Sequence, residues 1–253
     1  MSGQQRVVVV TGGGTGIGKA IAARFLTDGD TVVISGRREQ VLREAAHDLQ
    51  TSHGSGMVHW HVCDVGDPEQ VDGLTTWLTR QVAETVDVLV NNAGGTANLR
   101  DGASTAEAAR YANDTLSGNL VGTFLMVHAL GPQLRRPGGR IVNLSSIAAF
   151  RGGGDIYSAA KAGVVGLTYS LAGSLGPEGV TVNAVAPGVV LGTEFFGERM
   201  TEERRERTVA QVPAGRPGHP TDIAEAVFYL ASPSASYVNG EVLHVNGGWV
   251  FGR

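Results

Sequence analysis

Cysteine is scarce and long apolar segments are missing from this sequence of 253 residues. Cys63 is the single cysteine, so an intramolecular disulfide is excluded. The cysteine spacing that marks a metal site is missing as well. We therefore expect a buried, inert thiol and no bound metal. No signal peptide precedes Val7, and no apolar stretch is long enough to span a bilayer. These absences predict a cytoplasmic protein that has no membrane contact.

A strong charge of one sign is lacking too, because the net charge is −4 and charged residues make up only 17% of the chain. The one basic cluster lies within residues 204–207 and is interleaved with glutamates, which is typical of a solvated helix face. A nucleic-acid interface needs clustered Lys and Arg, so we predict no nucleic-acid partner. Glycine is frequent, with 37 residues, but it is spread along the chain without a collagen-like period.

Apolar, β-rich runs alternate with helical patterns along the chain, and hydrophobic residues, at 42%, supply enough material for one core. This alternation predicts one α/β domain over residues 1–253, a doubly wound, Rossmann-like parallel sheet of about seven strands with helices on both faces. The predicted strands are Arg6–Val10, Thr31–Ser35, Met57–Cys63, Val86–Asn91, Arg140–Leu144, Val180–Val185 and Val242–Val245. The predicted helices are Ile17–Thr27, Arg38–Leu49, Pro68–Ala83, Ala112–Leu134, Ile156–Leu175 and Thr221–Leu230.

Two segments, Gly95–Gly118 and Thr193–Pro220, do not fit this alternation. Long excursions in a compact domain tend to be lids or binding loops, and we predict a substrate lid over residues 193–220. In open α/β sheets the ligand lies at the carboxyl ends of the strands, where such loops emerge.

The segment 7–20, VVVVTGGGTGIGKA, joins a predicted strand to a predicted helix through a glycine-rich turn that is typical of a phosphate site. It departs from the ATP-type loop at Ala20, where a hydroxyl is needed to hold magnesium. It also departs from the ordinary dinucleotide pattern and instead has the form Thr11-Gly12-x-x-x-Gly16-x-Gly18. The turn alone leaves a purely structural glycine turn open as an alternative.

Tyr157 and Lys161 are four residues apart, a spacing that places both side chains on one face of a helix. A tyrosine ordinarily loses its proton near pH 10, and a neighbouring ammonium lowers that pKa. The pair is therefore a candidate proton donor and acceptor. Taken by itself, a buried tyrosine beside a lysine that reaches solvent is an equally ordinary helix feature.

Further motifs follow the glycine turn in this order: Asn91-Asn92-Ala93-Gly94, Asn119, Ser145-Ser146, Tyr157-Ser158-Ala159-Ala160-Lys161, and Pro187-Gly188 with Thr193 soon after. Together they resemble the short-chain dehydrogenase/reductase family, over almost the whole chain from Val7 to Gly248. The nearest functional groups are 3-oxoacyl reductases and secondary-metabolite ketoreductases.

The resemblance implies a catalytic role for four residues. Tyr157 would be the general acid in reduction and the general base in oxidation, and Lys161 would hold the nicotinamide ribose and tune the tyrosine. Ser146 would polarise the substrate carbonyl, and Asn119 would hold a water that links the lysine to solvent. Many members have thirteen positions between the serine and the tyrosine, whereas Ser146 lies eleven before Tyr157 and Ser145 twelve, so Ser145 stays a competitor.

The resemblance also implies a dinucleotide site, in which Asp64 would bind the adenine, Asn91 would lie near its ribose, and Gly188 and Thr193 would grip the nicotinamide amide. The complete set of implied cofactor residues is Gly12, Thr15, Gly16, Ile17, Gly18, Arg37, Arg38, Asp64, Val65, Asn91, Ala93, Gly94, Tyr157, Lys161, Pro187, Gly188, Val190 and Thr193.

The end of the second predicted strand indicates which dinucleotide is used. Gly36 stands where a site that prefers NAD places a carboxylate, and Arg37 follows it with a guanidinium that matches a phosphate. We therefore expect NADP(H) to be favoured over NAD(H), with Arg38 either helping or only beginning the next helix.

The predicted function is NADP(H)-dependent reduction of a small-molecule ketone, of the 3-oxoacyl or secondary-metabolite type, to a secondary alcohol. An NAD-dependent alcohol or sugar dehydrogenase and a non-catalytic dinucleotide-binding regulator are the alternatives. The resemblance of Asn239–Gly248 to the family's last strand implies a homotetramer or homodimer. Glu178 argues against docking of an acidic carrier protein, although Arg135 and Arg136 could still bind one. Phe195 and Phe196 would form an apolar substrate surface or anchor the lid.

Overall fold

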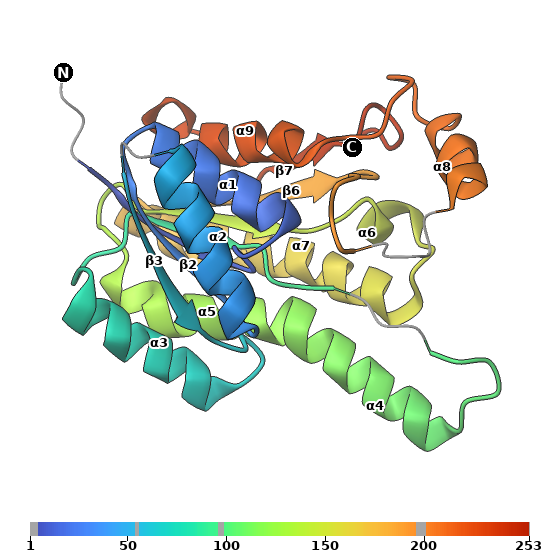
Figure 1. Cartoon of the computed structure of the whole chain (residues 1–253), viewed down its shortest axis with the longest axis horizontal. Coiled ribbons are helices and arrows are strands. Elements are labelled where there is room, and N and C mark those ends of the chain that lie inside the picture. The colour runs from blue at the N-terminus through green and yellow to red at the C-terminus, as the bar shows by residue number, and fades with distance from the viewer. Residues whose placement is uncertain (1–4, 54–55, 96–98, 196–200, 253) are drawn as a thin grey trace.

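The computed structural model describes residues 5–53, 56–95, 99–195 and 201–252 (Figure 1). At its centre is a parallel sheet with the strand order β3-β2-β1-β4-β5-β6-β7. The strands are β1 Val7–Thr11, β2 Thr31–Gly36, β3 Met57–Val62, β4 Val88–Asn91, β5 Arg140–Leu144, β6 Thr181–Pro187 and β7 Val242–Val245. Every adjacent pair is parallel, so the predicted doubly wound, Rossmann-like sheet is confirmed.

Helices cover both faces of the sheet (Figure 1). One apolar cluster joins alternate valines of the central strands to α1 (Gly16–Thr27), α2 (Glu39–Ser52) and α9 (Pro220–Leu230). The other cluster joins the intervening strand residues to α3 (Pro68–Gln81), α5 (Gly122–Leu130) and α7 (Asp155–Leu175). Because both faces are covered, β5 and β6 are buried at every position, including the polar residues Asn143 and Asn183.

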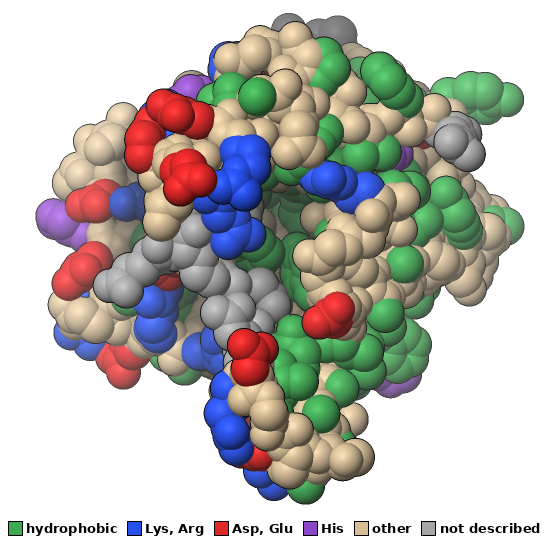
Figure 2. Space-filling view, turned by 90° about the vertical axis from the view of Figure 1, so that its right-hand side faces the viewer, with side chains coloured by type: hydrophobic (Ala, Val, Ile, Leu, Met, Phe, Trp, Pro, Cys, Tyr) green, Lys and Arg blue, Asp and Glu red, His purple; other side chains and the backbone are tan. Residues whose placement is uncertain are grey.

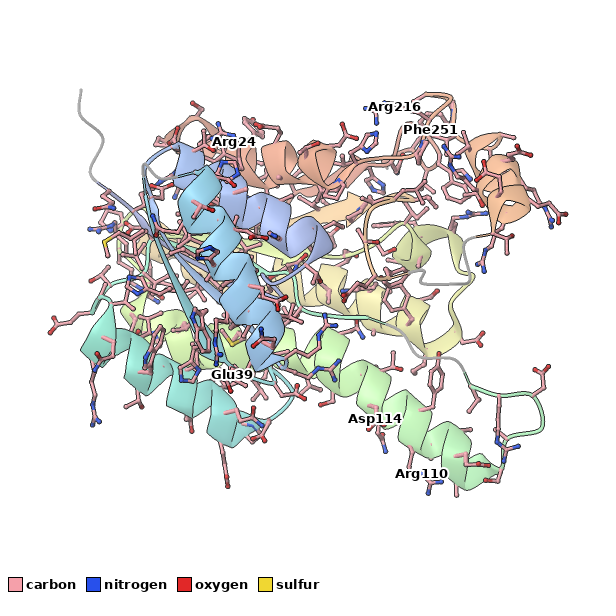
Figure 3. All side chains as sticks on the ribbon, viewed as in Figure 1. Arg24, Glu39, Arg110, Asp114, Arg216 and Phe251 are labelled. Carbon is pink, nitrogen blue, oxygen red and sulfur yellow. The ribbon has the colours of Figure 1, made fainter. Side chains whose placement is uncertain are left out.

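The predicted helix Ala112–Leu134 is wrong at its start and in its continuity. Helix α4 already begins at Thr105 and runs to Leu116, inside a segment expected to be irregular. Only Thr115 of this helix is fully buried, and side chains such as Arg110 and Asp114 project from it, so no fully buried apolar face marks it (Figure 3). Its sequence signal is instead the capping box between Ser104 and Glu107.

A π-helical turn, η1 (Ser117–Val121), separates α4 from α5. The remaining helices are short: η2 (Gly131–Gln133), α6 (Ala148–Arg151), η3 (Gly176–Glu178), α8 (Glu202–Val209) and η5 (Pro233–Ala235). None of the helices in the described ranges is long and apolar enough to cross a membrane.

The segment 193–220, predicted to be the lid, contains α8, which has no buried residue. An isolated bridge between Val190 and Gly218 closes the base of the excursion. Phe196 lies outside the described residues, and the lid itself stays a prediction. Figure 2 faces the end of the molecule that carries α8 and shows it hollowed near its centre, with hydrophobic side chains in the hollow and charged ones around it.

Candidate active site

The glycine-rich turn connects β1 to α1 at the carboxyl edge of the sheet. Gly12 and Gly16 have φ of +65° and +51°, a backbone region that side chains disfavour. A Cβ on Gly18 would lie 2.1 Å from the carbonyl oxygen of Gly12. These contacts require glycine at all three positions and leave the first N–H groups of α1 at a concave turn, the arrangement that binds a pyrophosphate.

Asn92, at the end of β4, fixes this turn from the side. Its Nδ2 donates to the carbonyl oxygens of Thr11 and Gly12, at 2.9 and 3.1 Å. In return the Thr11 hydroxyl accepts hydrogen bonds from the backbone N–H groups of Asn92 and Ala93, at 3.0 Å each. No role was predicted for Asn92 from the sequence. Its place in the motif Asn91-Asn92-Ala93-Gly94 was the available signal.

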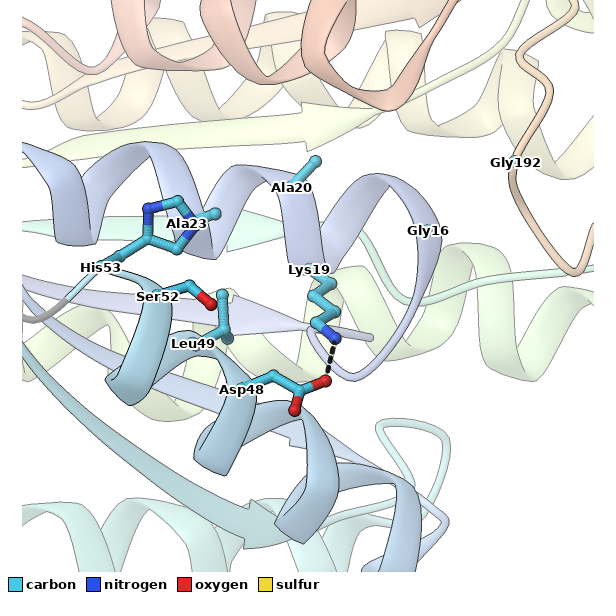
Figure 4. Close-up of a pocket in the computed structure, with 9 residues that line it drawn as sticks. All are labelled: Gly16, Lys19, Ala20, Ala23, Asp48, Leu49, Ser52, His53 and Gly192. Carbon is cyan, nitrogen blue, oxygen red and sulfur yellow. Dashed lines mark hydrogen bonds and ion pairs between the residues drawn. The ribbon is translucent and has the colours of Figure 1, made fainter.

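Lys19 extends from α1 towards α2 (Figure 4). Its Nζ donates to Asp48 Oδ2 of α2 at 3.0 Å, in a groove between α1 and α2 that Gly16 and Gly192 also line. In an ATP-type loop this lysine would have to reach the phosphates. Its ion pair with Asp48 therefore agrees with the departure from that motif at Ala20.

The end of β2 presents two arginines beside the turn. Arg37 is exposed and makes no hydrogen bond or ion pair with any residue that the structure describes. Arg38 Nη2 donates to Glu194 Oε2 at 2.6 Å, and the same carboxylate oxygen lies 3.5 Å from Thr15 Oγ1. A Cβ added to Gly36 would meet only Leu42, at 3.6 Å, so the space beside Arg37 is open.

The predicted adenine end is formed by Asp64 and Val65, which follow β3. The Asp64 carboxylate accepts the Gly66 backbone N–H at 3.0 Å, which closes a local turn. Val65 is buried. Asp67, not Asp64, caps α3.

The predicted catalytic residues meet at the N-terminal end of α7. Tyr157 and Lys161 are both buried. Lys161 Nζ lies 5.8 Å from the centre of the Tyr157 ring and donates to the carbonyl oxygen of Leu144 at 2.8 Å. A hydrogen bond joins the side chains of Ser146 and Tyr157. The structure thus brings serine, tyrosine and lysine together at the carboxyl end of β5.

The two adjacent serines have different partners. The Ser145 hydroxyl is buried and donates to the carbonyl oxygen of Lys161 at 2.9 Å, so it fastens β5 to α7. The Ser146 hydroxyl accepts the Ala148 backbone N–H at 3.1 Å and faces Tyr157. The loop to α7 contains Gly152 and Gly153 in left-handed conformations, as the shortened spacing to the tyrosine required.

Burial controls the pKa values of both Tyr157 and Lys161. It raises the pKa of Tyr157 to about 12, although the hydrogen bond with Ser146 acts in the opposite direction. It lowers the pKa of Lys161 to about 8. The sequence predicted that the ammonium would lower the pKa of the tyrosine; burial outweighs that effect here, and the ammonium is bound to Leu144 rather than to the phenol.

Asn119 lies in the π-helical turn and is buried. Its Nδ2 donates to the carbonyl oxygens of Gly95 and Thr115, at 2.7 and 2.9 Å, and its Oδ1 accepts the Gly95 N–H at 3.1 Å. A Cβ on Gly94 would lie 2.5 Å from Asn119 Oδ1 and 3.2 Å from Lys161 Nζ. Gly94 therefore fills the space between the asparagine and the lysine, and no bulkier residue would fit there.

Asn91 faces the interior of the sheet. Its Nδ2 donates to Asn143 Oδ1 at 2.9 Å, and Asn143 Nδ2 donates to Thr168 Oγ1 of α7 at 3.0 Å. This buried ladder of hydrogen bonds joins β4, β5 and α7. The Ala93 backbone N–H donates to the Thr11 hydroxyl, as described above. Ile17 is partly buried against the apolar cluster that contains α1.

The loop after β6 closes the site from the other side. The Gly188 N–H donates to the Val245 carbonyl at 3.0 Å, and the Pro187 carbonyl accepts the Ile147 N–H at 3.1 Å. The Thr193 hydroxyl donates to the carbonyl of buried Val190 at 3.3 Å. Thr193 Cβ lies 3.2 Å from the position of a Cβ on Gly16, so this loop touches the glycine turn directly.

Taken together, these residues fit a nicotinamide dinucleotide. The turn has the close backbone approach that a pyrophosphate needs, and a serine, a tyrosine and a lysine converge at the opposite end of the same edge. Phe195 places its ring 5.5 Å from the Tyr157 ring, where an apolar substrate would adjoin the tyrosine. Such an edge can hold a hydride donor beside a proton donor.

Comparison with known proteins agrees with this geometry. Residues 12–250 match the sequence model of a family described as enoyl-(acyl carrier protein) reductase. The chain is similar to 3-oxoacyl-[acyl-carrier-protein] reductases, with 39% identity over 251 residues to that of Vibrio cholerae (98% of each chain) and 38% over 248 residues to that of Aquifex aeolicus (97% of each chain). It is 38% identical over 247 residues to a (2S)-[(R)-hydroxy(phenyl)methyl]succinyl-CoA dehydrogenase subunit of Thauera aromatica, covering 97% of this chain and 96% of that one.

Among solved structures, the chain is similar to the crystal structure of a single-residue variant of actinorhodin polyketide ketoreductase with NADPH. The TM-score is 0.84 and the sequence identity 32%, over 97% of each chain.

Proposed function

The chain belongs to the short-chain dehydrogenase/reductase family and is an oxidoreductase of the ketone-reducing type, and from that premise we propose that it uses NADP(H) to reduce a 3-oxoacyl or secondary-metabolite ketone to a secondary alcohol. The observation that carries the proposal is the convergence of Ser146, Tyr157 and Lys161 at the edge that also holds the glycine turn.

The bound dinucleotide would supply a hydride to the carbonyl carbon of the substrate. Tyr157 gives its hydroxyl proton to the carbonyl oxygen, and Ser146 donates a hydrogen bond to the same oxygen. Lys161 holds the ribose hydroxyls, and its charge stabilises the phenolate that remains after proton transfer. Asn119, through a water, would link the lysine to solvent for reprotonation.

The pKa of Tyr157, about 12 in the protein without cofactor, supports the reductive direction. Reduction begins with a protonated tyrosine, whereas oxidation begins with a phenolate. At neutral pH the buried hydroxyl is protonated and ready to donate.

The choice of NADP(H) is supported by Gly36 and Arg37. The glycine removes the carboxylate that would repel a 2′-phosphate, and the exposed arginine lacks any described partner that a phosphate would have to displace. The similar polyketide ketoreductase was crystallised with NADPH, which points the same way.

The substrate class is supported by what the relatives share. Two act on 3-oxoacyl groups on a carrier protein and one on a substituted succinyl-CoA, so each name describes an acyl thioester. Arg135 and Arg136, the candidates for contact with a carrier protein, form ion pairs with Asp87 and Glu178. They lie before β5, at the far end of α7, a helix about 30 Å long that begins two residues before the tyrosine. A free acyl thioester is therefore our first test substrate.

The test is to follow oxidation of NADPH and NADH with a panel of 3-oxoacyl thioesters and simple ketones. We expect the higher kcat/KM with NADPH, and we expect Gly36→Asp combined with Arg37→Ala to shift the preference towards NADH. Tyr157→Phe is the control for chemistry: it should lower kcat by a factor of about 10²–10⁴ while the Kd for NADPH stays near that of the wild type. Binding without turnover of any ketone would favour the regulator.

We also propose a homodimer or homotetramer. Tyr169 on α7 and Phe124 on α5 are 54% and 49% exposed, although both are large and apolar. Sedimentation velocity should show no monomer at micromolar concentration, and a single monomeric species would contradict the proposal.

A further inference from the structure

The ion pair between Arg38 and Glu194 has no part in the function proposed so far. The Arg38 guanidinium donates to both carboxylate oxygens of Glu194, at 2.6 Å to Oε2 and 3.3 Å to Oε1. The two residues are 156 positions apart: Arg38 precedes the first residue of α2, and Glu194 lies in the segment that follows β6. Two parallel bonds to one carboxylate orient the guanidinium as well as bind it.

The Glu194 carboxylate lies at the rim of the glycine turn. Its Oε2 is 3.5 Å from Thr15 Oγ1, and the preceding residue, Thr193, packs against Gly16. The 2′-phosphate of NADP(H) would have to lie beside the end of β2, where Gly36 is followed by the two arginines. One guanidinium therefore faces two candidate anions, the carboxylate already bound to it and the phosphate of the cofactor.

We infer that Glu194 is a specificity-determining residue, because its carboxylate competes with the 2′-phosphate for Arg38. The preference for NADP(H) over NAD(H) is therefore weaker than it would be if Arg37 and Arg38 were both free to bind the phosphate. The inference rests on the proposed use of NADP(H). Arg37 has no described partner and is available at once, whereas Arg38 becomes available only when its ion pair opens. NAD(H) carries a neutral hydroxyl at this position, so it does not compete for Arg38.

The expected effect is modest, because the side chains of Arg38 and Glu194 are 58% and 59% exposed. Exposed ion pairs are weak, and breaking one costs an amount that corresponds to about a two- to fivefold change in affinity. The effect also depends on salt, since the screening length falls from about 10 Å at 0.1 M to about 3 Å at 1 M.

The test is Glu194→Gln, which keeps the shape of the side chain and removes its charge. The Kd for NADPH and for NADH is measured by fluorescence titration of the whole protein at low salt, without substrate. We expect Glu194→Gln to lower the Kd for NADPH about two- to fivefold and to leave the Kd for NADH unchanged. In 1 M salt the gain should disappear.

Glu39→Gln is the matched control, because Glu39 lies next to Arg38 at the start of α2 but pairs with Arg43, at 2.6 Å (Figure 3). Glu39→Gln also removes one negative charge near Arg38, but it leaves the ion pair of Arg38 intact. We therefore expect a smaller gain in NADPH affinity than from Glu194→Gln. In an Arg38→Gln background, Glu194→Gln should no longer change the Kd for NADPH.

The inference is overturned if the wild type prefers NADPH but Glu194→Gln leaves that affinity unchanged or weakens it, or if Glu39→Gln gives an equal gain. The proposed function stands in that case. A wild type that binds NADH as tightly as NADPH overturns the proposed cofactor preference itself, and these two failures are distinguished by the wild-type ratio alone.

Discussion

The two serines after β5 show how adjacent residues of one type take different tasks. Ser145 is turned inward and donates to the backbone of Lys161, while Ser146 faces the hydroxyl of Tyr157. Only one of the two hydroxyls therefore reaches the place of a substrate oxygen. The spacing to the tyrosine could not decide between them, because the glycine run in the connecting loop permits either register.

We predict that Ser146→Ala lowers kcat by about 10²-fold, because a hydrogen bond to the developing oxyanion is lost. Ser145→Ala should keep kcat within about tenfold of the wild type but lower the free energy of unfolding by about 1 kcal/mol, since it removes a buried hydrogen bond. Steady-state rates and urea unfolding of both variants test this. The reverse order of the two rates would place the catalytic hydroxyl at Ser145.

Residues fixed by local spacing were predictable, and residues fixed by distant partners were not. Tyr157 and Lys161 are four apart on one helix, and the glycines of the turn lie within seven positions, so the sequence alone indicated that each group lies together. Asn92 is bonded to residues about eighty positions away, and Glu194 to one 156 positions away. The motif around Asn92 marks that residue, but nothing in the local sequence marks Glu194 or identifies the distant partner of either residue.

At the scale of elements, the turn between β1 and α1 is held by β4 rather than by its own glycines. The glycines permit the conformation, but the bonds from Asn92 to Thr11 and Gly12 select it. A helix N-terminus binds phosphate only while its N–H groups point at one place. The side chain of Asn92 would therefore belong to the proposed phosphate site without facing the phosphate.

We predict that Asn92→Asp raises the Kd for NADPH by about tenfold or more, because a carboxylate oxygen would face two carbonyl oxygens where an amide now donates to both. Asn239→Asp is the control. The amide of Asn239 donates to the Ala172 carbonyl at 3.0 Å, away from the turn, so its loss should lower stability but not NADPH affinity. Equal effects of the two variants on the Kd would contradict the prediction.

The elements that the sequence predicted poorly are those without an apolar face. The valine-rich strands and α1, α2, α3, α7 and α9 were found because burial imposes their pattern. The start of helix α4 was missed because this helix buries only Thr115 fully. The π-helical turn was missed because no local sequence pattern marks it; within it, the Asn119 side chain donates to the carbonyl oxygens of Gly95 and Thr115.

At the scale of the whole molecule, the proposed catalytic centre lowers the stability of the fold, because it contains a buried charge. Lys161 is buried, its Nζ is bound to a single carbonyl oxygen, and burial lowers its pKa to about 8. At neutral pH the protein without cofactor therefore contains a buried cation, which lowers the free energy of unfolding. Conflict of this kind between stability and activity is expected at catalytic sites.

The sign of the resulting pH dependence follows from proton binding. Between about pH 8 and the ordinary lysine pKa of 10.5, the unfolded chain keeps a proton on Lys161 that the folded protein has lost. The free energy of unfolding contributed by this residue therefore rises with pH in that range and is lowest below pH 8.

We predict that Lys161→Met, which keeps the length of the side chain and removes its charge, abolishes turnover and changes stability in a pH-dependent way. Relative to the wild type, the variant should be most favoured at pH 7, and its advantage should decrease by up to about 3 kcal/mol as the pH approaches 10. The measurement is urea unfolding of both proteins, without cofactor, at several pH values. Because Tyr157 and Cys63 titrate in both proteins, their contributions cancel to first order in the difference. A difference that stays constant between pH 7 and pH 10 would show that folding leaves the pKa of Lys161 at its ordinary value, and the stability cost assigned to the buried ammonium would then be wrong.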